Sequence, residues 1–152
     1  MRSHEKFGKT TWPTVAQAGL AFVWAGLVLG LSFIETPLKF SAPGITQVLG
    51  VGIGRVVFTA LNRTELLFCV LLTVGLFVGR RDTLRCCLFA VVLTIVLMQT
   101  FWLLPVLDRR AQLFIAGNPL PDSFHHILFI VIESSKLLTL IAFGAVAARR
   151  GA

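Results

Sequence analysis

The sequence predicts an all-α integral membrane protein, a four-helix bundle that forms a single membrane domain over residues 1–152. The first observation is composition: 56% of the residues are hydrophobic and 14% are charged, whereas soluble domains average about 25% charged residues. The second is a set of four apolar runs, over about 14–35, 56–79, 84–107 and 124–148. Each run can cross a bilayer, which takes about 20 residues at helical rise.

The first apolar run, over about 14–35, is expected to be a retained span rather than a signal peptide. A signal peptide has an apolar core of about 7–15 residues followed by a small-residue cleavage site. This run is longer, and Glu-Thr-Pro follows it. Within it, Gly26-Leu-Val-Leu-Gly30 is a GxxxG motif, which lets another helix approach closely. We expect that helix to belong to the same subunit rather than to a dimer partner.

The stretch from Glu35 to Gly54 has the least regular pattern. It contains six residues that interrupt helices, namely Pro37, Pro43, Gly44, Gly50, Gly52 and Gly54. Proline lacks a backbone donor, and glycine pays a large entropic cost in a helix. The sequence therefore predicts an interfacial or irregular segment between the first and second helices.

A polar stripe marks the start of the second helix. Arg55, Asn62 and Glu65 follow at steps of seven and three residues, which places them on one helix face. Arg55 stands among glycine and valine, where an unpaired guanidinium would be poorly solvated. We therefore predict that Arg55 pairs with an acidic group near the outward edge of the membrane, with Glu35 and Glu65 as the candidates.

The third helix, over about 84–107, carries Gln99 in its second half and Pro105 near its end. Gln99 is the side-chain amide closest to the middle of a predicted span. A polar loop is expected over 108–123, where Asp122 or Ser123 can cap the fourth helix.

The fourth helix brings ionisable side chains to membrane depth. His126, Glu133 and Lys136 share one helix face at positions i, i+7 and i+10. A charged group at the bilayer centre costs about 2.5–3.5 kcal/mol on insertion scales, so it faces a partner or a water-filled cavity. We predict that Glu133 pairs with Lys136, with Gln99 as its hydrogen-bonding partner across the bundle. The pair either locks the helix packing or forms a proton, ion or ligand site.

The basic residues predict the orientation of the chain. One side of the membrane receives Arg2, Lys6, Lys9, Arg80, Arg81, Arg85, Arg149 and Arg150; the other receives Lys39, Arg55, Arg63, Arg109 and Arg110, spread over longer loops. Positive residues favour the cytoplasmic side. We therefore expect a multi-pass protein of the bacterial inner membrane with both termini in the cytoplasm. The same clustering accounts for the net charge of +7 without a nucleic-acid partner.

In this orientation the polar residues gather at the outward ends of the helices. Glu35, Asn62, Gln99 and His126 lie in the outward halves, whereas the cytoplasmic halves are almost wholly apolar. The sequence thus predicts an outward-opening polar vestibule above a dry cytoplasmic half.

Several motifs resemble those of small uncharacterised bacterial inner-membrane proteins with four helices. They are Ser32-Phe-Ile-Glu-Thr-Pro-Leu-Lys-Phe40, Gly54-Arg-Val-Val-Phe58 with Leu61-Asn62 and Glu65, Gln99-Thr-Phe-Trp-Leu-Leu-Pro-Val-Leu-Asp108, and the helix that carries His126, Glu133 and Lys136. The resemblance covers nearly the whole chain. It implies the four-helix fold and no particular activity.

A second resemblance rests on the spacing Arg-x6-Asn-x2-Glu formed by Arg55, Asn62 and Glu65. It is similar to the start of helix two in the membrane-associated proteins in eicosanoid and glutathione metabolism. Those are four-helix trimers that activate the thiol of glutathione. The resemblance implies that these three residues would hold the glutathione peptide.

These observations leave three functional hypotheses. The first is a non-enzymatic subunit or small-ligand binder that uses no cofactor, with an outward polar vestibule and the lipid bilayer, a second copy or another membrane protein as partner. The second is a glutathione-dependent enzyme. The third is a proton-coupled transporter that uses Glu133. The candidate site residues are Glu133, Lys136, His126, Gln99, Arg55, Asn62, Glu65 and Glu35.

Overall fold

The structure, a computed structural model, describes residues 12–79, 82–118 and 124–151. The basic leader before Trp12, the turn residues Arg80 and Arg81, and the candidate caps Asp122 and Ser123 lie outside these ranges. The described elements are α1 (Trp12–Val28), the π-helical η1 (Leu29–Glu35), α2 (Thr36–Leu38), the 3-10 turn η2 (Lys39–Ser41), α3 (Gln47–Val78), α4 (Thr83–Met98), the π-helical η3 (Gln99–Leu103), α5 (Leu104–Ile115) and α6 (His125–Gly151).

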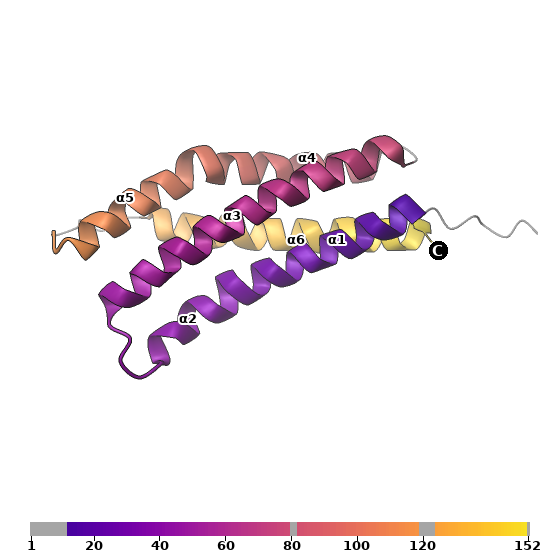
Figure 1. The fold of residues 1–152 in the computed structure, drawn as a ribbon. Coiled ribbons are helices and arrows are strands. Elements are labelled where there is room, and N and C mark those ends of the chain that lie inside the picture. The colour runs from indigo at the N-terminus through magenta and orange to yellow at the C-terminus, as the bar shows by residue number, and fades with distance from the viewer. Residues whose placement is uncertain (1–11, 80–81, 119–123, 152) are drawn as a thin grey trace, which may run out of the picture.

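These elements join into four spans, which confirms the predicted all-α bundle. The spans cover Trp12–Ser41, Gln47–Val78, Thr83–Ile115 and His125–Gly151, and each is long and apolar enough to cross a membrane. The start of α1, the end of α3, the start of α4 and the end of α6 lie at one end of the bundle (Figure 1). The turn between η2 and α3 and the end of α5 lie at the other end.

The irregular segment is much shorter than predicted. The first span stays helical through Ser41, and α3 begins at Gln47. The side chain of its N-cap residue, Thr46, accepts a hydrogen bond from the Leu49 amide at 3.2 Å. The non-helical part is a turn over 42–46, in which Gly44 has a φ of 81°. The predicted irregular segment is therefore present, but it covers 42–46 instead of 35–54. A helix keeps every backbone hydrogen bond within the segment, which an apolar environment demands.

Two prolines follow π-helical turns inside the spans and do not end the helices. η1 ends two residues before Pro37, and η3 ends two residues before Pro105. A proline ring removes one amide donor and clashes with the carbonyl four residues earlier, and a π-helical turn is one way for a helix to absorb that clash. The third span therefore continues to Ile115, so the predicted helix end at 107 and the loop over 108–115 were wrong.

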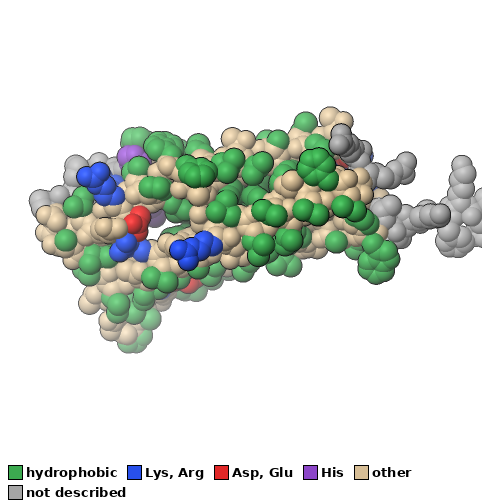
Figure 2. Space-filling model, turned by 45° about the horizontal axis from the view of Figure 1, so that its top comes forward, with side chains coloured by type: hydrophobic (Ala, Val, Ile, Leu, Met, Phe, Trp, Pro, Cys, Tyr) green, Lys and Arg blue, Asp and Glu red, His purple; other side chains and the backbone are tan. Residues whose placement is uncertain are grey.

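The core and the outer surface are both apolar. The interior is packed with large side chains that include Trp24, Val28, Leu72, Leu140 and Phe143. Hydrophobic side chains cover most of the face seen in Figure 2, and charged side chains gather toward one end beside a hollow. A surface of this kind suits contact with lipid.

The GxxxG motif does not pack as expected. No other part of the described chain lies within 4 Å of the position of a Cβ atom at Gly19, Gly26 or Gly30. The expectation of close packing inside the subunit was therefore wrong. Close helix approach occurs instead at Gly50, where the Phe40 ring covers the position that a Cβ atom would occupy.

Candidate functional site

Three charged side chains meet in the interior of the bundle, and we call them the charge cluster: Glu65 of α3 with Glu133 and Lys136 of α6. Lys136 Nζ lies 2.5 Å from Glu65 Oε1 and 2.6 Å from Glu133 Oε2. The exposed fractions are 0% for Lys136, 1% for Glu133 and 2% for Glu65. The ion pair between Glu133 and Lys136 was predicted and is confirmed, whereas the second carboxylate on Lys136 was not expected.

Neutral polar groups complete the charge cluster. Gln99 Nε2 donates to Glu133 Oε2 at 3.1 Å, and Lys136 Nζ donates to Gln99 Oε1 at 2.8 Å. Ser32 Oγ donates to Glu133 Oε1 at 2.9 Å, and Trp24 Nε1 donates to Glu65 Oε1 at 3.0 Å. The predicted role of Gln99 is confirmed. Sequence reasoning missed Ser32 and Trp24, so it did not foresee that all four spans meet here.

Both π-helical segments supply a side chain to the charge cluster. Ser32 lies in η1 and Gln99 lies in η3. π-helical turns are rare and are frequently found at functional sites. The sequence signal for them was a proline five or six residues further on, at Pro37 and Pro105, which was interpreted as the end of a helix.

A cavity of about 930 Å³ opens beside the charge cluster, and we call it the vestibule. Its lining comes from all four spans and reaches inward to Glu133. The lining is mostly apolar and includes Phe33, Phe40, Phe58, Val51, Leu104, Leu107 and Phe129. The polar lining includes Ser32, Lys39, Arg55, Asn62, Thr100, Asp108 and His126. A cavity therefore lies at the end of the helices where the sequence predicted one, but its lining is mostly apolar, whereas a polar lining was predicted.

A second, very small gap lies beside the vestibule and shares Phe58, Asn62 and Glu133 with its lining. Its volume is about 10 Å³, and its lining includes Asn62, Glu65, Gln99 and Glu133. That volume is close to the room that one water molecule needs. The gap therefore places one water-sized space against both carboxylates of the charge cluster.

Two ion pairs stand toward the mouth of the vestibule. Arg55 Nε lies 2.6 Å from Asp108 Oδ1, and Lys39 Nζ lies 3.4 Å from Glu35 Oε2. The prediction that Arg55 pairs with an acidic side chain is confirmed, but the two candidates, Glu35 and Glu65, were wrong. Because the third span continues past Pro105, α5 brings Asp108 beside Arg55, while Glu65 turns inward to Lys136.

The opposite end of the bundle holds a separate polar network. Arg85 is 2% exposed; its Nη1 donates to Gln17 Oε1 at 3.0 Å, and its Nε lies 3.3 Å from Asp82 Oδ2. Gln17 Nε2 in turn donates to the Gly75 carbonyl at 2.7 Å. The expectation of an almost wholly apolar half was therefore wrong at its end.

An apolar layer separates this network from the charge cluster. It consists of Val28, Leu72, Val96 and Leu140, whose exposed fractions are 0% or 1%. Leu140 follows Lys136 by one helical turn, and Val96 precedes Gln99 by three residues. The vestibule therefore ends at the charge cluster, and dry core lies beneath it.

The remaining predicted site residues lie apart from the charge cluster. His126 lines the vestibule two helical turns outward of Glu133, and Asn62 Nδ2 donates to Thr100 Oγ1 at 2.8 Å. No group of three or more His, Cys, Asp and Glu residues is placed to hold a metal ion within the ranges that the structure describes.

The three positions that resemble a glutathione site do not form one surface. Arg55 and Asn62 line the vestibule, whereas Glu65 is turned into the charge cluster and holds Lys136 and Trp24. No protein-family model, curated protein or solved structure matches this chain. Its function is therefore inferred from the geometry of the site.

Proposed function

We propose that this protein is a multi-pass protein of the bacterial inner membrane that binds a small ligand in the vestibule from the outer side. One observation carries the proposal: a cavity of about 930 Å³, lined by all four spans, ends on buried charged groups. Ligand pockets typically measure about 300–1,000 Å³ and are mostly apolar with a few placed polar groups. The vestibule has this size and this lining.

The depth of the charge cluster supports access from one side. Tryptophan favours the membrane interfaces. The exposed Trp12 stands at the start of the first span, and the exposed Trp102 stands 19 residues after the first residue of α4 (102 − 83). A hydrocarbon core of about 30 Å takes about 20 helical residues. Counted from Arg149, that length reaches Phe129, about 6 Å outward of Glu133 at 1.5 Å per residue. Glu133 thus lies about one turn inside the bilayer, with the vestibule at headgroup level.

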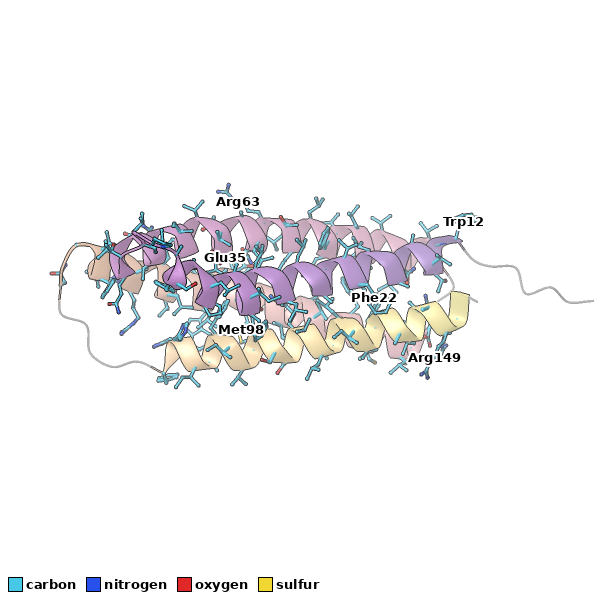
Figure 3. All side chains as sticks on the ribbon, turned by 90° about the horizontal axis from the view of Figure 1, so that it is seen from below. Trp12, Phe22, Glu35, Arg63, Met98 and Arg149 are labelled. Atoms are coloured by element: carbon cyan, nitrogen blue, oxygen red, sulfur yellow. The ribbon has the colours of Figure 1, made fainter. Side chains whose placement is uncertain are left out.

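The basic residues support the orientation with both termini in the cytoplasm. Trp12 and Arg149 lie at the same end of the bundle (Figure 3). Arg85 and Arg150 belong to that end too, since both lie within hydrogen-bonding distance of Asp82. Positive residues near membrane-spanning helices favour the cytoplasmic side, so the vestibule would open outward.

A proton-coupled transporter is the second candidate, because Glu133 lines the vestibule and an ionisable group at membrane depth is a candidate for coupling. Transport also requires a route to the other side. The apolar layer of Val28, Leu72, Val96 and Leu140 closes that route in this conformation. Binding needs no such opening, so it is the better supported function.

A ligand screen tests the proposal. Purified protein in detergent is heated with a panel of lipids, glutathione, metal ions and small amphiphiles, and the Tm is recorded. Ala111 lines the vestibule, so Ala111→Trp should fill it. Ala60 is exposed on α3 and does not line the vestibule, so Ala60→Trp is the matched control.

We expect a ligand that raises the Tm of the wild type and of Ala60→Trp but leaves Ala111→Trp unchanged. A panel whose every hit stabilises Ala111→Trp as much as the wild type would contradict binding in the vestibule.

A further inference from the structure

The charges around the vestibule do not balance. Toward its mouth, Arg55 is matched by Asp108 and Lys39 by Glu35, one to one. At its closed end, two carboxylates share the single ammonium of Lys136. With every group ionised, one negative charge at the closed end is left without a partner.

An unbalanced charge inside an apolar bundle is costly, so a second cation is expected to neutralise it. The two carboxylate oxygens of Glu133 have different partners. Oε2 contacts Lys136 and Gln99, whereas Oε1 accepts a hydrogen bond from Ser32. Since Ser32 itself lines the vestibule, Oε1 is the oxygen nearest to a molecule that enters there.

The walls of the vestibule suit a cation that carries apolar groups. Phe33, Phe40, Phe58 and Phe129 contribute to the lining, and the rings of Phe58 and Phe129 meet edge to face at 5.2 Å. Aromatic faces attract cations. Lys39 Nζ already lies 5.6 Å from the Phe40 ring and 5.8 Å from the Phe58 ring.

From these observations, and resting on the proposed function, we propose that the ligand is a lipophilic organic cation that exchanges with a proton shared by Glu65 and Glu133. In the empty protein one carboxyl holds the proton. When the cation binds beside Glu133, that proton leaves to water in the vestibule, and the net charge of the site is the same before and after. The water-sized gap that touches Asn62, Glu65, Gln99 and Glu133 provides a place through which the proton can pass.

Other titratable groups surround Glu133 and must be separated from it in a test. Glu65 and, one turn further inward, Cys69 lie on α3, Lys136 and His126 lie on α6, and Glu35 lies on η1. The pair of Arg55 and Asp108 stands toward the mouth. A histidine side chain commonly changes its charge between pH 5 and 8, so His126 needs its own variant.

The test uses two ions of the same shape and opposite charge, tetraphenylphosphonium and tetraphenylborate. Equilibrium dialysis of the full-length protein in detergent measures the Kd of each as the pH is raised. We expect the phosphonium to bind and the borate not to bind. Because one proton leaves as one cation enters, the phosphonium affinity should rise about tenfold per pH unit over the range of exchange.

Substitutions identify the groups that carry the exchange. Glu133→Gln and Glu65→Gln each remove one of the two carboxylates, so the remaining carboxylate is balanced by the ammonium of Lys136. Either change should therefore weaken phosphonium binding about tenfold or more, equivalent to ~1.4 kcal/mol. Either change should also remove the pH dependence of that binding. Two variants are used because one of them can fail to fold. His126→Gln should keep the pH dependence. Arg63→Gln is the control, since Arg63 points away from the bundle in Figure 3.

Tighter binding of the borate than of the phosphonium would overturn the proposal. A phosphonium affinity that changes neither with pH nor with the two Gln substitutions would overturn it too. If the panel yields a ligand that Ala111→Trp excludes but the phosphonium does not bind, the cation inference fails and the proposed function stands. If the panel yields no such ligand either, both fail.

Discussion

Lys136 is the residue through which α3 and α6 are joined. Its ammonium contacts one carboxylate on each helix and is fully buried. Sequence alone paired it with Glu133, because the two are three residues apart on one helix face. Glu65 lies 71 positions earlier in the chain than Lys136 (136 − 65), and helical periodicity carries no information about such a contact.

Lys136→Met should lower the free energy of unfolding by about 3–5 kcal/mol, the loss typical of breaking a buried ion pair. The substitution leaves Glu65 and Glu133 facing each other without a cation. Glu133→Gln should cost less, because the Gln side chain can still bond to Ser32 and Gln99 while Lys136 keeps Glu65. Denaturant unfolding in detergent measures both, with Arg63→Gln as the control. A Lys136→Met variant as stable as the wild type would refute the role assigned to the cluster.

At the scale of elements, the two π-helical turns shape the site. Pro37 and Pro105 are visible in the sequence, yet a proline in a helical pattern more often ends the helix than widens it. Tertiary packing decided the outcome here, since η1 and η3 both turn a polar side chain toward Glu133. Because Pro105 was interpreted as the end of the third helix, Asp108 was predicted to lie in a loop, and its ion pair with Arg55 was not predicted.

The packing of η2 against α3 leads to a second prediction. Gly50→Val should push the Phe40 ring away, because a Cβ atom at Gly50 would overlap Phe40 Cε1. The distance between spin labels at Leu38 and Val48 should then increase or broaden. Gly52→Val is the matched control, since nothing lies within 4 Å of a Cβ atom there. Equal distance distributions for the two variants would show that Phe40 does not hold this end of the first span.

At the scale of the whole molecule, hydrophobic runs were sufficient to predict four spans, and the alternation of successive spans was sufficient to predict which helix ends lie together. The interior contacts were harder, because they join side chains on different helices. Arg85 shows this well: as part of a basic turn it looked like a surface residue, yet it is buried against Gln17 and Asp82. The sequence feature that could have indicated this burial is Asp82, three residues earlier, which is the N-cap residue of α4.

The orientation of the bundle gives a third prediction. Two reporter enzymes are fused after Ala152, one that is active only in the cytoplasm and one that is active only in the periplasm. The cytoplasmic reporter should be active and the periplasmic one inactive, because positive residues flank the end of α6. Both reporters are fused to the same position and compared at equal expression. Activity confined to the periplasmic reporter would reverse the assigned orientation and close the vestibule to the outside.

The central claim is that a wet vestibule reaches the charge cluster from the outer side and stops there. Cysteine labelling tests it directly, in a variant whose native Cys69, Cys86 and Cys87 are replaced by serine or alanine. Ser32 lines the vestibule beside Glu133, and Val28 is fully buried one turn further in. A membrane-impermeant thiol reagent added outside intact cells should label Ser32→Cys and leave Val28→Cys unmodified. Labelling of Val28→Cys, or protection of Ser32→Cys in the folded protein, would contradict the account.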